Sequence, residues 1–106
     1  MNKLIETLTF CKRIGALELG FDQVRQALDS GRARLVLLAG DLSPKTEKEL
    51  LFLCGRAGVP VEKTGLRQDE YWYLIGKRTG VIGVTHPVFA EKLRSVIESG
   101  QTGREK

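Results

Sequence analysis

The chain has 106 residues, of which 42% are hydrophobic and 28% are charged, and its formal net charge is +4. This length suits one compact domain, and the composition excludes a disordered or fibrous protein. The 17 basic residues outnumber the 13 acidic ones without clustering in a tail, which is only a weak indication of a nucleic-acid partner. No apolar run is long enough to cross a bilayer, and Glu6 interrupts the first one. We therefore expect a cytoplasmic protein without a signal peptide or a membrane partner.

Two helices are predicted in the first part of the chain. Apolar residues at helical spacing indicate a helix over about residues 2–13, and Gly15 ends that pattern. A second amphipathic helix follows Gly20 and is ended by Ser30 and Gly31. No regular element is predicted between the two helices.

The middle of the chain alternates strand, helix and strand. The apolar run at residues 34–39 is too short for a helix and suits a strand buried on both faces, which predicts a sheet covered on two sides. Ser43 and Pro44 then open a helix as N-cap and first-turn proline, and this helix runs to Gly58. Residues 59–63 are predicted as an edge strand, because they contain a proline that only an edge tolerates.

The last third of the chain continues this alternation. A short helix is predicted near residues 68–75, a strand at residues 81–85 and a final helix from Pro87. The order of elements predicts a three-layer α/β/α sandwich around a small mixed sheet, with right-handed crossovers between parallel neighbours. We expect residues 1–98 to form this single domain. Residues 99–106, which are rich in glycine and polar side chains, are expected to form a disordered tail.

Few residues suggest catalysis or metal binding. Cys11 and Cys54 lie in apolar helical patterns without other ligands at metal-binding spacing, so we expect reduced core cysteines. The loop over residues 39–46 resembles a phosphate-binding loop, but Ala39 and Pro44 replace both required glycines. Since proline has no N–H to offer a phosphate, a capped helix start is the better interpretation of this loop.

The titratable side chains also have structural interpretations. His86 stands before a proline at a strand-to-helix turn, with no nucleophile or orienting group nearby in the sequence. Asp69 and Glu70 are adjacent and cannot face one substrate from a helix, but they suit its first turn. Lys45 is expected to be solvated behind the Ser43 cap. The sequence therefore predicts no enzyme, no cofactor and no metal.

Three consecutive aromatic residues precede a pair of cations. Tyr71, Trp72 and Tyr73 are followed by Lys77 and Arg78, an arrangement that suggests base stacking. Three consecutive helical residues cannot share one face, so one or two of the rings must point into the core. The sequence predicts that at most one ring is available to a ligand.

Three segments together resemble, in order and spacing, the kink-turn-binding ribosomal protein superfamily, whose large-subunit members are called seven-Ae and thirty-e. These segments are residues 20–28, 33–44 and 75–85. The likeness covers residues 3 to about 98 and is closest to the short bacterial, stand-alone members of YlxQ type. It implies an α/β/α sandwich that binds the kink-turn, a sharply bent RNA internal loop with tandem sheared G·A pairs.

The resemblance also implies which residues touch RNA. In that family the glycine before the second helix and the polar residues of its first turns enter the RNA groove, and Gly20, Asp22, Gln23 and Gln26 occupy these positions. The Gln23 amide can both donate to and accept from a purine edge. Many relatives have asparagine and lysine where this chain has Asp22 and Gln26, which implies weaker attraction to phosphates. Asp22 serves equally well as a helix cap, and Arg25 either restores the lost charge or stays solvated.

Two further contact surfaces follow from the resemblance. One is the loop after the central strand, where relatives commonly have acidic residues and this chain keeps Asp41. The other is the loop with Lys77, Arg78 and Thr79, whose cations can grip phosphates. Trp72 stands where relatives usually have a small residue, so it can remodel this loop. The full set of candidate RNA-binding residues is Gly20, Phe21, Asp22, Gln23, Arg25, Gln26, Asp41, Lys77, Arg78 and Thr79.

The leading hypothesis is a non-catalytic, monomeric protein that binds a kink-turn or related structured RNA, associates with the ribosome and has no small-molecule substrate. An alternative is a protein-interaction module that keeps the fold and has lost the RNA site, which the departures at Asp22, Gln26 and Trp72 would permit. A third class, a nucleotide enzyme that uses Lys45 and Thr46, predicts binding of ATP or GTP, which we do not expect.

Overall fold

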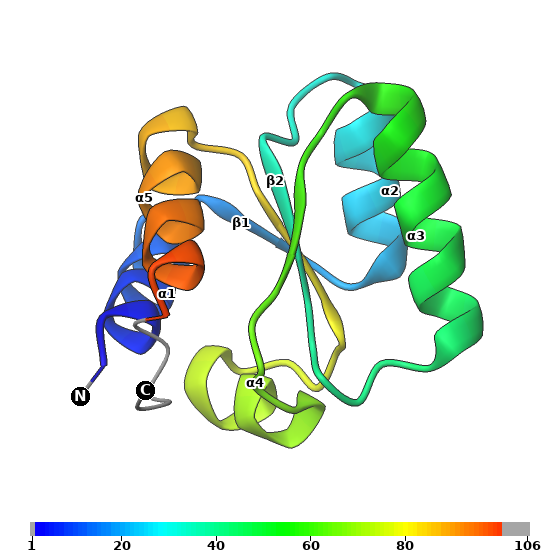
Figure 1. Cartoon of the computed structure of the whole chain (residues 1–106). Coiled ribbons are helices and arrows are strands. Elements are labelled where there is room, and N and C mark those ends of the chain that lie inside the picture. The colour runs from blue at the N-terminus through cyan, green and yellow to red at the C-terminus, as the bar shows by residue number, and fades with distance from the viewer. Residues whose placement is uncertain (1, 101–106) are drawn as a thin grey trace.

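A mixed sheet of four strands lies at the centre of the computed structural model, which describes residues 2–100 (Figure 1). The strand order is β1-β4-β2-β3. Strand β4 runs antiparallel to both of its neighbours, whereas β2 and β3 are parallel. This sheet confirms the predicted mixed topology. The strands are β1 (Leu17–Leu19), β2 (Leu35–Leu38), β3 (Val61–Lys63) and β4 (Val81–Val84).

Helices cover both faces of the sheet, as the sequence predicts. Helices α1, α4 and α5 supply one hydrophobic cluster, and α2 and α3 supply a second cluster on the opposite face (Figure 1). Within residues 2–100, no helix has both the length and the apolar character needed to cross a membrane. The helices are α1 (Lys3–Arg13), α2 (Phe21–Asp29), α3 (Pro44–Ala57), α4 (Gln68–Ile75) and α5 (Pro87–Glu98).

Strand β2 shows why the sheet needs two covering layers. All four of its residues are buried. Leu35 and Leu37 point into the cluster with α1 and α5, whereas Val36 and Leu38 point into the cluster with α2 and α3. Since side chains of a strand alternate between faces, an uninterrupted apolar strand is stable only between two apolar layers.

Strand β1 is the element that the sequence analysis missed. It comprises only three half-buried residues, Leu17 to Leu19, and it pairs with β4 from Leu17–Val84 to Leu19–Ile82. Its apolar pattern is too short to stand out, and its position is fixed by pairing with a strand more than sixty residues later. It forms one edge of the sheet, and the predicted edge strand β3 forms the other.

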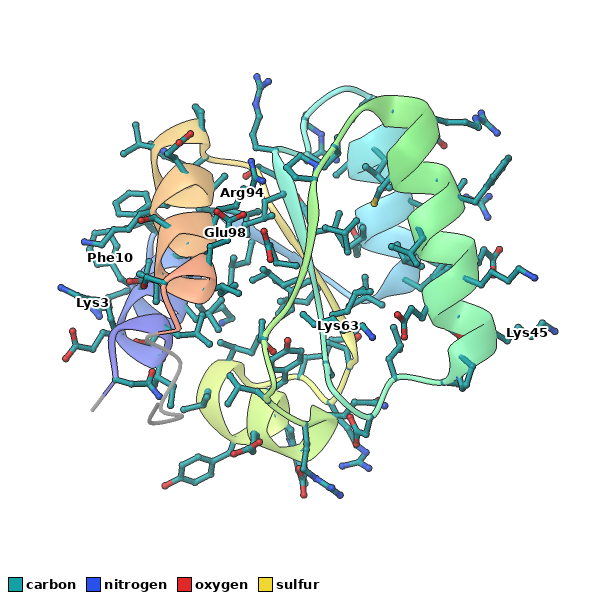
Figure 2. All side chains as sticks on the ribbon, in the orientation of Figure 1. Lys3, Phe10, Lys45, Lys63, Arg94 and Glu98 are labelled. Atoms are coloured by element: carbon teal, nitrogen blue, oxygen red, sulfur yellow. The ribbon has the colours of Figure 1, made fainter. Side chains whose placement is uncertain are left out.

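Ion pairs hold edge strand β3 on both faces. Glu62 lies 3.5 Å from Arg94 of α5, which also pairs with Glu98 at 3.1 Å. On the other face Lys63 pairs with Glu47 of α3 at 2.9 Å. Figure 2 shows Arg94 and Glu98 together on α5 and Lys63 on edge strand β3. Burial and the neighbouring Glu98 carboxyl raise the pKa of Glu62, and Arg94 opposes this shift.

The C-terminal end of the domain is described only as far as residue 100. The predicted tail starts at residue 99, but Ser99 still belongs to the end of α5, because its N–H donates to the Ser95 carbonyl at 3.0 Å. The remainder of the predicted tail, residues 101–106, lies outside the described residues.

Both cysteines are free and buried, as predicted. The reactivity of their thiols therefore tests whether both hydrophobic clusters exclude solvent. Burial raises the pKa of the Cys11 thiol and raises that of Cys54 to about 11. At mildly alkaline pH both groups therefore stay neutral and shielded, and we expect the native protein to react slowly with Ellman's reagent. In guanidinium chloride both thiols should react at once, and a Cys54→Ala variant should show half of that signal. Rapid reaction of both thiols in the native protein would contradict the two-sided core.

Candidate nucleic-acid interface

Three segments that are distant in the sequence meet at one end of the sheet, where β1 and β2 finish and β4 begins. Because β4 runs antiparallel between β1 and β2, the ends of β1 and β2 lie beside the start of β4. Two backbone hydrogen bonds join these segments: Gly20 N–H donates to the Val81 carbonyl at 3.0 Å, and Ala39 N–H donates to the Gly80 carbonyl at 2.9 Å. The structure therefore brings together the backbone of the three surfaces that the sequence singled out. We call this region the loop edge: residues 20–26, 39–42 and 77–80.

Gly20 is the turning point at the start of α2. Its φ of 101° and ψ of 159° fall in a region that is essentially restricted to glycine. Gly20 is the N-cap of α2, and no side chain makes a capping hydrogen bond there. The interpretation of Asp22 as a cap is therefore wrong, because its carboxylate lies in the first turn without bonding to the end amides. The first N–H groups of α2 consequently have no side-chain acceptor and can receive an external anion.

The exposed face of α2 presents the predicted polar residues. Asp22, Gln23, Arg25 and Gln26 are all exposed. Arg25 takes part in none of the ion pairs formed within residues 2–100. Phe21 differs from them, because it is half-buried and packs against the α2–α3 cluster. Its ring therefore anchors the helix start.

Lys77 reaches across from the opposite loop to the start of α2. A methyl group in place of the Gly20 hydrogen would lie 3.5 Å from both Cε and Nζ of Lys77. The ammonium group thus sits near the positive end of the helix dipole, where a cation is unfavourable by itself. An anion placed there would be attracted by both charges. Asp22, the only acidic residue in the first turn, supplies a counter-charge nearby in the sequence.

The two residues after Lys77 have different environments. Arg78 is exposed and belongs to none of the ion pairs formed by residues 2–100. Thr79 is buried, and its hydroxyl accepts from Val81 N–H at 3.2 Å and lies 3.4 Å from the Val81 carbonyl. Its side chain therefore shapes the loop, whereas Arg78 is accessible to a ligand.

Asp41 ties the second loop to α4. Its carboxylate accepts from the N–H of Gln68 at 3.0 Å, and its carbonyl accepts from the Gln68 side-chain amide at 3.3 Å. Gly80 packs tightly against this junction, since a methyl group at its position would come within 2.6 Å of Leu42 Cδ1 and 3.3 Å of Gln68 Cδ. Asp41 thus positions α4 beside the third loop, a role that sequence reasoning did not identify.

The aromatic run on α4 divides differently from the prediction. Tyr71 is fully buried, and its hydroxyl lies 2.6 Å from Thr64 Oγ1. Burial raises the pKa of Tyr71 strongly. Trp72 is 59% exposed and Tyr73 is 89% exposed, so two rings are accessible and not at most one. The prediction was wrong because the residues of α4 that enter the core are Tyr71, Ile75 and, partly buried, Leu74, which leaves Trp72 and Tyr73 outside it.

The other titratable candidates have structural roles. Ser43 caps α3 by accepting from Thr46 N–H at 3.3 Å, and Figure 2 shows Lys45 pointing away from the domain. His86 caps α5, because its Nδ1 accepts from Val88 N–H at 3.2 Å. Asp69 and Glu70 lie in the first turn of α4, as predicted. Residues 2–100 contain no cluster of three His, Cys, Asp or Glu side chains that could hold a metal ion.

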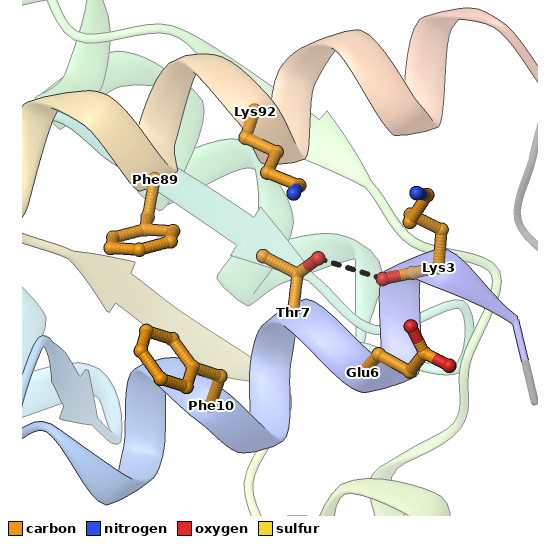
Figure 3. Close-up of a pocket in the computed structure, with 6 residues that line it drawn as sticks. All are labelled: Lys3, Glu6, Thr7, Phe10, Phe89 and Lys92. Carbon is orange, nitrogen blue, oxygen red and sulfur yellow. Dashed lines mark hydrogen bonds between the residues drawn. The ribbon is translucent and has the colours of Figure 1, made fainter.

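A shallow hollow of about 210 Å³ lies between α1 and α5 (Figure 3). Phe10 and Phe89 form one wall, with ring centroids 5.2 Å apart. Two lysines, Lys3 and Lys92, and one carboxylate, Glu6, line it (Figure 3), so the net charge of the lining is positive. The hollow is built from elements outside the loop edge.

The fold is a small α/β/α sandwich with polar segments gathered at one end of its sheet, and comparison identifies the family. Residues 2–86 match the model of the Ribosomal protein L7Ae/L30e/S12e/Gadd45 family, and the chain belongs to this family. The resemblance recognised from the sequence is thereby confirmed.

Solved structures agree with this fold. A protein of unknown function from Bacillus halodurans is 35% identical, with a TM-score of 0.86 over 92% of this chain and 99% of that one. The Giardia lamblia 15.5kD RNA binding protein is 18% identical, with a TM-score of 0.73 over 91% of this chain and 82% of that one. A comparison with curated protein sequences gave no match.

Replacing Gly20 tests the strained start of α2. Because only glycine adopts its backbone angles without strain, Gly20→Ala should lower the free energy of unfolding by about 1–3 kcal/mol in urea titrations. Gly55 is the matched control, since it lies inside α3 with open space around it. Gly55→Ala should raise stability by about 0.5–1 kcal/mol. Equal effects of the two substitutions would contradict the role assigned to Gly20.

Proposed function

We propose that this protein is a non-catalytic RNA-binding protein that recognises a kink-turn or a related structured RNA through the loop edge, in association with the ribosome. The observation that carries the proposal is the position of the Lys77 ammonium beside Gly20, at a helix start whose N–H groups lack a capping side chain. Two positive potentials meet at this point, which favours a phosphate oxygen as the ligand.

The neighbouring residues supply the remaining contacts. Gln23 follows on the exposed face of α2, where its amide can pair with a purine edge. Arg25 and Arg78 add charges that are not used in ion pairs within residues 2–100, and they suit the backbone phosphates on either side. Asp41 and Thr79 enter the proposal as residues that hold the loops in place.

Family membership supports RNA as the ligand. The family description names ribosomal proteins, and the Giardia lamblia neighbour is named as an RNA binding protein. The second candidate is a protein-interaction module, which the exposed Asp22 carboxylate favours because it repels phosphates close to the proposed site. A cellular complex that survives ribonuclease treatment would support this alternative.

Titration with a kink-turn RNA tests the proposal. At moderate salt the protein should bind this RNA more tightly than an unstructured RNA of equal length. Gln23→Ala should weaken binding by about 1–3 kcal/mol, because a purine edge loses its partner. Lys77→Ala should weaken binding to all structured RNAs and reduce the salt dependence by about one released counterion.

Lys45→Ala provides the matched control, since Lys45 is an exposed lysine at the start of α3 beyond the loop edge. This variant should bind like the unmodified protein, apart from a small non-specific loss. The proposal is wrong if the kink-turn RNA has no advantage over the unstructured RNA and neither Gln23→Ala nor Lys77→Ala changes its affinity.

A further inference from the structure

Two large aromatic side chains of α4 remain exposed without a structural role. Trp72 is 59% and Tyr73 is 89% exposed, although neighbouring Tyr71 is fully buried. An aromatic side chain of this size gains free energy when it is covered, so exposed rings in a well-ordered element commonly mark contact sites. None of the contacts argued above for RNA uses either ring.

Helix α4 is held firmly enough to present a side chain in a fixed place. Tyr71 anchors it through the 2.6 Å contact with Thr64. Asp41 binds the first N–H of the helix at Gln68. Glu70 completes the start by accepting from Arg67 N–H at 2.8 Å. A ring on this helix is therefore pre-organised, and a ligand would lose little conformational entropy by ordering it.

Trp72 lies on the side of α4 that faces the third loop. The side chain of Gln68 packs against Gly80, with its Cδ 3.3 Å from the position of an added methyl group. Trp72 follows Gln68 by four residues, so the two share one face of the helix. One turn later Gly76 closes the helix by donating to the Trp72 carbonyl at 2.9 Å, and the chain passes directly into Lys77. Tyr73 points about 100° away from this face.

The surroundings of Trp72 favour a nucleic acid as the occupant. Lys77 and Arg78 follow Trp72 by five and six residues, directly after the end of α4, and neither forms an ion pair within residues 2–100. The two carboxylates of the first turn of α4 already have partners, because Asp69 pairs with Arg67 at 3.8 Å and Glu70 accepts from Arg67 N–H at 2.8 Å. An exposed indole beside free cations suits a nucleotide, whose base stacks on the ring while its phosphate meets the cations.

We propose that Trp72 extends the loop edge by stacking on an unpaired base that flanks the structured RNA element, with Lys77 and Arg78 holding the adjacent phosphates. The inference rests on the proposed function and adds that the preferred RNA carries a single-stranded nucleotide beside its structured part. Tyr73, on another face, takes no part in this contact.

The chain has one tryptophan, so its fluorescence reports on this site alone when tyrosine is not excited. The test compares a blunt-ended kink-turn RNA with versions that carry a short unpaired extension at either end. We expect one extension to quench the Trp72 emission and to tighten binding. Trp72→Ala should abolish that gain, a loss of about 5-fold to 150-fold, whereas Trp72→Phe should keep part of it. Tyr73→Ala is the matched control and should keep the whole gain.

The outcomes separate this inference from the function on which it rests. If the protein binds the blunt and extended RNAs equally and the Trp72 emission does not change, the stacking site is wrong while the RNA-binding function stands. If Tyr73→Ala removes as much affinity as Trp72→Ala, a general aromatic surface replaces the specific site. If no RNA in the series binds better than an unstructured control, both proposals fail, and Trp72 is more consistent with a protein contact.

Discussion

Strand β4 lies antiparallel between β1 and β2, and the candidate site depends on this placement. It brings the ends of two strands beside the start of a third, so that the backbone of Gly20 bonds to Val81 and that of Ala39 bonds to Gly80. Without this pairing the polar loops would lie at unrelated positions. The apolar sides of the helices cover both faces of the sheet. Polar groups can therefore gather at the ends of the strands.

The loop edge combines two sources of positive potential with one residue that limits them. The start of α2 presents amides without a capping side chain, and Lys77 lies within van der Waals distance of the Gly20 position. Asp22 in the same turn reduces the net charge. If the proposed function holds, this site discriminates by geometry more than by total charge, because a phosphate must fit between a fixed helix end and one lysine to gain from both.

Local signals predicted most elements, whereas long-range contacts had to come from the structure. Helix α4 was predicted near its observed bounds, Gln68 to Ile75, because acidic first-turn residues and a terminal glycine are local features. It missed β1, whose three residues are fixed only by pairing with β4. The same division holds for the candidate site. Gly20 was recognisable from the sequence. Contacts between distant segments, which the sequence does not reveal, bring Lys77 to Gly20, place Asp41 at the start of α4 and bury Thr79.

Backbone amide chemical shifts, recorded by NMR during addition of a kink-turn RNA, test the central claim most directly. Binding at the loop edge should shift the amides of residues 20–26 and 77–80 and leave those around the α1–α5 hollow of Figure 3 unchanged. Shifts confined to Lys3, Phe10 and Lys92, with none at the start of α2, would show that the protein binds through the α1–α5 surface and would contradict the account.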